Sequence, residues 1–283
     1  MRTAVLVFLL FISLYSFGQD KPSYVIYNSN GKKVTYAKMV KSLQDQDVIL
    51  FGEFHDNPIS HWLQLELTKD LVKSKDLILG AEMFEADNQD ELNAYLEGKI
   101  DAKALDSMAR LWSNYKTDYA PLVDFAKENS ISFIATNIPR RFARLVHRGG
   151  FSVLDTLTTE EKSWIAPLPV PYDSLLPTYQ EILVMMGDHA TPELVKAQAI
   201  KDATMAYFIS ENWNKSKLFL HFNGAYHSNY YEGIGWYIEQ YNPTIRKGVI
   251  STVTQSDNSK LSEEHIGKAD FIICVDEDMT STH

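Results

Sequence analysis

The sequence contains one cysteine in 283 residues, Cys274, so no disulfide bond can form within the chain. It is also poor in positive charge, with 27 Lys and Arg against 37 Asp and Glu, a net charge of -10 and no basic cluster. This balance argues against binding to nucleic acid or to an anionic membrane surface. No phosphate loop, nucleophile elbow or Cys-x-x-Cys motif is present, which removes the most recognisable classes of nucleotide, serine-hydrolase and thiol-redox sites.

Apolar runs of membrane-spanning length are also missing. A short run at positions 4–12 follows Arg2 and precedes small residues at Ser16 and Gly18, the pattern of a signal peptide. We therefore expect a signal peptide at 1–18, a mature domain at 19–283 with no transmembrane span, and export to the periplasm, the cell envelope or the medium. A retained N-terminal anchor is the alternative. No cysteine lies near the predicted cleavage site, so we expect no lipid anchor there.

Short apolar runs recur along the chain and are separated by segments with helical spacing. Such runs indicate strands that are buried on both faces. The expected strands are 24–27, 48–51, 77–81, 131–135, 217–222, 249–254 and 271–275. The expected helices are 35–43, 58–72, 88–98, 102–112, 121–129, 159–164, 176–186, 192–213 and 234–241, with one more that has Pro139 near its start. The pattern predicts an α/β fold with a largely parallel sheet flanked by helices on both faces.

A change of composition at 149–192 interrupts this alternation. Five prolines and two tyrosines occur there, and no strand pattern fits. We expect a smaller helical subdomain formed by this region, about 149–190, together with about 87–118.

Four of the predicted strands end in side chains that can carry chemistry. Glu53 and His55 follow the first, Glu82 the second, Arg140 the third and His227 the fourth. Because the carboxyl ends of parallel strands meet at one edge of a sheet, these side chains are expected to converge. Solvated loop ends are the alternative for each residue taken alone.

Two of these ends share the pattern Gly-x-x-His, at Gly52 and at Gly224. A glycine lets the backbone turn sharply after a strand, and a histidine three residues later can point back over the sheet. His55 and His227, with Glu53 and Glu82, resemble the mixed nitrogen and oxygen ligands of a divalent metal site. A metal there would activate a water molecule for hydrolysis, with Arg140 available to hold an anionic group.

Three residues of the proline-rich region are candidates for binding a cofactor. Tyr172 and Tyr179 can ligate haem iron through the phenolate, and His189 can meet the strand ends or a partner chain and is a further haem candidate. Packing of a helical cap is the alternative for both tyrosines.

Taken together, the motifs resemble those of the ChaN-like haem-binding proteins, in the superfamily that includes Tiki proteases and erythromycin esterases. The matching stretches are Gly52-Glu53-Phe54-His55-Asp56-Asn57, Ala81-Glu82-Met83-Phe84-Glu85 with Gln89, Trp112 with Tyr115 and Tyr119, 135–141, 197–206 and Asn223-Gly224-Ala225-Tyr226-His227. The resemblance implies a large parallel sheet, a helical subdomain, and haem held between two protomers by a tyrosine. It also implies a role in haem or iron acquisition. The Gly-x-x-His pair resembles the metal-site pattern of the Tiki branch.

Two hypotheses follow. The first is an exported haem-binding protein, in which a homodimer is the possible assembly. The second, if the protein is an enzyme, is a metal-dependent hydrolase of ester or peptide-like bonds.

Overall fold

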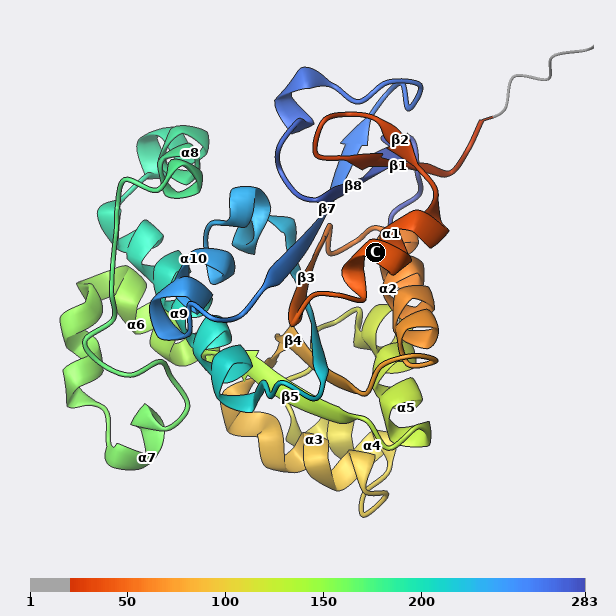
Figure 1. Ribbon diagram of the computed structural model, residues 1–283. Helices are drawn as coiled ribbons and strands as arrows, with labels where there is room; N and C mark the ends of the chain where they lie inside the picture. Colours follow the sequence, from red (N-terminus) through yellow and green to blue (C-terminus); the bar gives the residue numbers. More distant parts are fainter. Residues whose placement is uncertain (1–20, 283) are drawn as a thin grey trace, which may run out of the picture.

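The computed structural model describes residues 21–282 and shows one eight-stranded sheet between two layers of helices (Figure 1). The strand order is β2-β1-β8-β7-β3-β6-β4-β5. The six strands from β8 to β5 pair in parallel, whereas β1 pairs antiparallel with both β2 and β8. The strands are β1 Tyr24–Asn28, β2 Lys33–Val34, β3 Val48–Glu53, β4 Leu77–Glu85, β5 Ser132–Asn137, β6 Leu218–Gly224, β7 Lys247–Gln255 and β8 Phe271–Asp276. The predicted α/β fold is confirmed, and the sequence missed only the two-residue strand β2.

Ten α-helices cover the two faces of the sheet in the described chain. They are α1 Tyr36–Leu43, α2 Pro58–Leu71, α3 Gln89–Leu96, α4 Ala102–Met108, α5 Ala120–Glu128, α6 Arg140–Gly149, α7 Thr159–Lys162, α8 Pro177–Met186, α9 Pro192–Asn212 and α10 Ile234–Tyr241. The first five pack with one face of the sheet into a single apolar core. On the other face α9 and α10 form a second core, and α6 and α8 lie outside α9.

The central strand β3 shows why the sequence folds in this way. All six of its residues are buried, so both faces need apolar side chains. The polar turn after it ends at Asn57, whose side chain accepts a hydrogen bond from the Ser60 backbone N–H and begins α2. Pro58 occupies the first turn, where its missing N–H removes no helical hydrogen bond.

The outer edge of the parallel strands is protected by Gln89. Its side-chain amide donates to the Phe133 carbonyl at 3.0 Å and accepts from the Ala135 N–H at 2.7 Å. The side chain thereby satisfies backbone groups of the edge strand β5 that a further strand would otherwise pair with.

The helical segments that the sequence assigned to one subdomain lie in two places. Helices α3 and α4 pack near α5 and β5, whereas α7 and α8 lie on the α6 and α9 side (Figure 1). The second segment, with α6 and α9, stands beside the carboxyl ends of the strands and is the part that borders the site.

Within residues 21–282, no helix is long and apolar enough to cross a bilayer. The predicted signal peptide at 1–18 lies outside the described residues, so it stays a prediction.

The topology leaves a crevice at the carboxyl ends of β3 and β6. These strands are neighbours, with Glu53 beside Gly224, yet the chain leaves β3 toward α2 on one face and leaves β6 toward α10 on the other. Ligands of open α/β sheets bind at such a point, because the connecting segments separate there.

Candidate functional site

A cavity of about 670 Å³ opens at these strand ends. Its lining includes all five residues that the sequence placed at the site: Glu53, His55, Glu82, Arg140 and His227. Side chains from α6, α8 and α9 complete the walls. The structure therefore brings together side chains from four strand ends.

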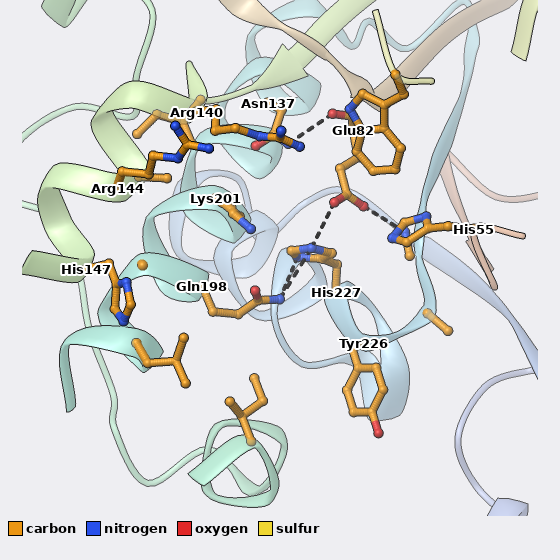
Figure 2. A pocket seen from close by; sticks show the side chains of 18 of the residues that line it. His55, Glu82, Asn137, Arg140, Arg144, His147, Gln198, Lys201, Tyr226 and His227 are labelled. Atoms are coloured by element: carbon orange, nitrogen blue, oxygen red, sulfur yellow. Dashed lines mark hydrogen bonds and ion pairs between the residues drawn. The ribbon is translucent and has the colours of Figure 1, made fainter. Parts of the chain in front are cut away.

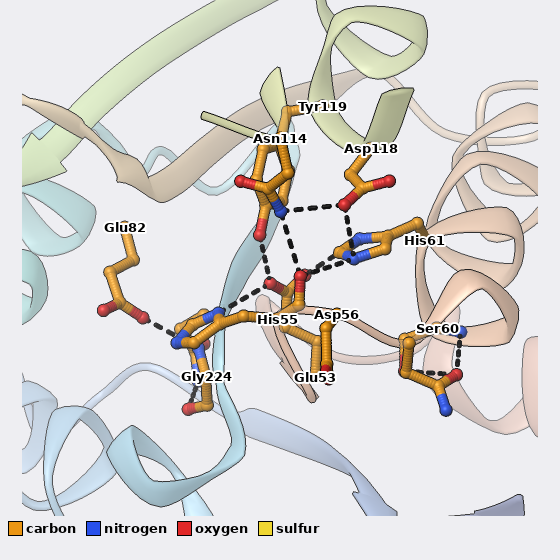
Figure 3. A network of polar contacts seen from close by, with 12 residues as sticks. Glu53, His55, Asp56, Ser60, His61, Glu82, Asn114, Asp118, Tyr119 and Gly224 are labelled. Atoms are coloured by element: carbon orange, nitrogen blue, oxygen red, sulfur yellow. Dashed lines mark hydrogen bonds and ion pairs between the residues drawn. The ribbon is translucent and has the colours of Figure 1, made fainter. Parts of the chain in front are cut away.

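Glu53 is 1% exposed and anchors one side of the cavity. It accepts hydrogen bonds from the Tyr119 hydroxyl at 2.7 Å, from the Gln64 side chain, and from His55 Nδ1 at 2.9 Å (Figure 3). Buried His61 lies behind it, with Nδ1 3.5 Å from Glu53 Oε2. Because Glu53 accepts a hydrogen bond from His55 Nδ1, the second ring nitrogen of His55 is left on the cavity side, beside Gly224.

The electrostatics of His55 follow from this contact. Burial lowers its pKa, but the hydrogen bond to Glu53 and the charges of Glu82 and Glu53 outweigh burial and raise the pKa above its ordinary value. The imidazole therefore holds a proton more readily than a histidine in water.

His227 is buried between two carboxylates on the other side of the cavity. Its Nδ1 donates to Asp202 on α9, and its Nε2 lies 3.2 Å from Glu82 Oε1 (Figure 2). Burial lowers the pKa of His227, but both carboxylates outweigh it and raise the pKa to about 10. Burial also raises the pKa of Glu82, and the charge and hydrogen bond of His227 reverse this and hold it well below its usual range. Burial raises the pKa of Asp202, so we infer that at neutral pH His227 is an imidazolium whose main anionic partner is Glu82.

This arrangement predicts a loss of stability in alkali. The pKa of His227 is about 10 in the fold against 6.5 ordinarily, so its stabilisation is complete below pH 6.5 and disappears as pH rises toward 10. Urea unfolding between pH 6.5 and 9.5 should show a free energy of unfolding that falls by up to about 1.4 kcal/mol per pH unit. The His227→Gln variant should show a much shallower fall. A flat wild-type profile would rule out a protonated His227.

The two glycines of the Gly-x-x-His pattern work differently from the expectation. Neither Gly52 nor Gly224 has a positive φ, so neither uses the left-handed conformation that only glycine adopts readily. Each glycine allows a neighbouring part of the chain to approach its Cα closely. A Cβ at Gly52 would lie 2.9 Å from the Ala225 Cα, and one at Gly224 would lie 2.9 Å from His55 Nε2. The second contact shows why a side chain at position 224 would push His55 out of place.

Helices α6 and α9 form the opposite wall and present matching faces. Arg140, Ala143, Arg144 and His147 of α6, and Leu194, Ala197, Gln198 and Lys201 of α9, line the cavity. Both sets have the spacing i, i+3, i+4, i+7 of one helix face. Figure 2 shows the labelled side chains of this wall across the cavity from His55.

The candidate cofactor residues of the proline-rich region lie outside this lining. Tyr179 is buried and its hydroxyl donates to Asp202 at 2.8 Å, and Tyr172 stacks against it. His189 is exposed in the short helix Gly187–His189. None of the three borders the cavity. Tyr179 instead holds Asp202, which in turn holds His227.

The structure does not support the predicted divalent metal site. Within residues 21–282 no group of three or more His, Cys, Asp or Glu side chains is arranged to hold a metal ion. The reason is visible in the contacts: both nitrogens of His227 face carboxylates, so His227 is not available as a ligand beside His55. A metal-dependent hydrolase is therefore not favoured.

Comparison with known families agrees with this geometry. The family model described as haem-binding uptake, Tiki superfamily, ChaN, matches residues 39–238, most of the chain and nearly all of the cavity lining. The chain belongs to this ChaN family. The resemblance inferred from the motifs is confirmed.

Solved structures and one curated protein extend the comparison. ChaN of Campylobacter jejuni, 19% identical, superposes with a TM-score of 0.66 over 88% of this chain and 96% of that one. An erythromycin esterase variant in its open conformation, 11% identical, gives 0.51 over 90% and 97%. These likenesses show a shared fold. The chloroplast protein RETICULATA-RELATED 5 of Arabidopsis thaliana is 27% identical over 135 residues, which span 45% of this chain and only 18% of that protein.

Proposed function

We propose that this ChaN-family chain is an exported haem-binding protein that serves haem or iron acquisition, with haem in the cavity at the strand ends. The observation that best supports this proposal is the cavity itself. It lies at the crevice of the sheet, and its lining residues fall within the region that matches the family. The Campylobacter jejuni relative is described as binding haem cofacially. Export is supported by the apolar run at 4–12 and the small residues after it.

The lining suits a large, flat, mostly apolar ligand. A volume of about 670 Å³ lies within the range of small-molecule sites. Apolar side chains come from three sides: Trp112, Ile138, and the group Ile182, Met185 and Leu194. Cationic side chains stand at one end, where a haem could place its propionates.

Three residues of the lining can ligate iron. His55 has one nitrogen bound to Glu53 and the other on the cavity side, the usual arrangement of a ligating histidine. Tyr226, 43% exposed at the mouth, and His147 on α6 are the others. Bound haem would supply an iron, which an imidazole or a phenolate of these residues would ligate.

Titration of the purified protein with haemin tests the proposal. We expect a shifted Soret band that saturates at about one haemin per chain. Substituting the ligating residue, by His55→Ala, His147→Ala or Tyr226→Phe, should move the band again, and His189→Ala, outside the cavity, should not. A spectrum that remains that of free haemin throughout would overturn the proposal.

We also propose that two protomers meet over the cavity mouth. Helix α8 and the residues before it expose Leu175 at 76% and Val184 at 81%, next to Met185 and Met186. The hydroxyl of Tyr226 contacts Met185 Sδ, which ties this apolar surface to the mouth. Exposed apolar patches of this kind mark association surfaces.

This assembly predicts a change of mass. With haemin present, sedimentation should give a dimer for the wild type and a monomer for the double variant Leu175→Asp, Val184→Asp, because two desolvated carboxylates would oppose the contact. The Met108→Asp variant, exposed on α4 away from the mouth, should remain dimeric. A wild type that sediments as a monomer at all haemin concentrations would contradict the assembly.

A further inference from the structure

One wall of the cavity carries positive charge that the cavity's acids do not neutralise. We call Arg140, Arg144 and Lys201 the cationic wall. All three line the cavity, in a protein whose net charge is -10. Within residues 21–282, none of them forms an ion pair with an acid. Lys201 acts on Glu82 only at longer range, where its charge helps to lower the pKa of that carboxyl.

The acids of the lining, by contrast, are each paired with another group. Glu53 accepts from His55, and Glu82 faces the protonated His227. Glu85 accepts from Arg110 Nε at 2.8 Å. A surplus of positive charge therefore remains on the α6 and α9 side, and an anionic ligand would balance it.

The position of Arg140 is unfavourable without such a ligand. It is the first residue of α6, where the helix dipole disfavours a cation, and no acidic residue lies in that turn. The next residue, Arg141, forms an ion pair with Asp87 outside the cavity lining, which offsets the unfavourable effect of the dipole on its charge. Arg140 and Arg144 instead share one face of the helix with His147, on the cavity.

The wall also has a defined position relative to the apolar lining. Arg140, Arg144 and Lys201 gather on one side in Figure 2, across the cavity from His55. A ligand with a flat apolar body and acidic groups at one edge would contact the apolar lining and the cationic wall at the same time. Its acidic edge would meet the cations, and its centre would lie toward His55 and Tyr226.

We propose that the cationic wall binds the carboxylates of an anionic, amphiphilic tetrapyrrole and thereby sets its orientation in the cavity. This inference rests on the proposed function and adds the ligand's charge as a requirement. Charge-assisted contacts between guanidinium and carboxylate are about twice as strong as neutral hydrogen bonds, so esterified carboxyls should bind distinctly less well.

The test compares haemin with haemin dimethyl ester, which keeps the ring and iron and lacks the two negative charges. We expect the wild type to bind haemin about tenfold or more tightly than the ester, and added salt to weaken haemin binding. The triple variant Arg140→Gln, Arg144→Gln, Lys201→Gln should bind both forms alike, at the ester's affinity. Arg148→Gln, a basic residue of α6 outside the lining, should retain the wild-type preference.

The outcomes distinguish a failure of this inference from a failure of the proposed haem-binding function. Equal binding of haemin and its ester by the wild type would overturn the role of the wall and leave haem binding in place. A triple variant that still prefers haemin tenfold would do the same. Binding of neither form by the wild type would overturn the proposed function and the inference with it. Circular dichroism of each variant verifies that it is folded, as substitutions at exposed positions and at the partly exposed Lys201 predict.

Discussion

The Asp202→Leu variant is expected to lose about 3–5 kcal/mol of its free energy of unfolding, because removal of one partner leaves a buried charge uncompensated. Asp202 is fully buried in α9 and accepts from His227 Nδ1 and from the Tyr179 hydroxyl. With leucine at position 202, His227 Nδ1 and the Tyr179 hydroxyl would be buried without their acceptor. His227 would keep only Glu82 as a charged partner.

Urea unfolding followed by tryptophan fluorescence measures this loss. Asp202→Asn keeps an oxygen acceptor without the charge, so it should cost clearly less than leucine. Glu193→Gln is the matched control, since its pair with Lys196 on the same helix is partly exposed and worth at most about 1 kcal/mol. If Asp202→Leu is no more damaging than Glu193→Gln, the buried triad of Asp202, His227 and Glu82 does not stabilise the fold as described.

The Leu194→Trp variant is expected to weaken haemin binding by more than about tenfold while leaving the fold nearly unchanged. Leu194 lines the cavity from the first turn of α9 and is only partly buried, so an indole there extends into the cavity rather than into the core. A ligand that fills the cavity loses that space. A tenfold weaker affinity corresponds to a loss of about 1.4 kcal/mol of binding free energy.

The comparison variant is Leu145→Trp. Leu145 is an exposed leucine of α6 that does not border the cavity, so haemin affinity should stay within about twofold of the wild type. Both variants should unfold within about 1 kcal/mol of the wild type in urea. Equal haemin affinity for Leu194→Trp and the wild type would place the ligand outside this cavity.

The fold could be predicted closely because its strands have a clear apolar sequence pattern. The strands β3 and β6 are mostly apolar runs with a glycine at or next to their last residue, and such runs indicate burial on both faces. Parallel pairing then fixes which ends share an edge. The convergence of Glu53, Glu82 and His227 therefore follows from elementary topology, and the structure places all three in one lining.

The ligand side of the site was much harder to predict. The cavity wall comes from α6 and α9, and their polar residues recur at i, i+4 spacing, which a solvated helix face also shows. Neither Arg144 nor His147 stands out in the sequence for this reason. The signal available in hindsight is the absence of any acid in the first turn of α6, where two arginines stand.

Asp202 illustrates a second limit. The sequence shows an acid on the apolar face of a long helix, in the stretch Ala197–Ala206, which is unusual because a buried carboxylate needs a partner. Its partner, His227, lies 25 residues away on another element, and only the packing of α9 against the end of β6 brings the two together. Tyr179 is a haem candidate from the sequence because nothing local indicates that its hydroxyl donates to Asp202.

The most direct measurement of the central claim is a crystal structure of the protein with haemin, with anomalous data collected at the iron absorption edge. The account predicts one iron peak per chain inside the cavity, between His55 and the cationic wall, with the propionates toward Arg140, Arg144 or Lys201. An iron peak beside Tyr172 or His189, or no ordered iron in crystals that contain saturating haemin, would contradict it.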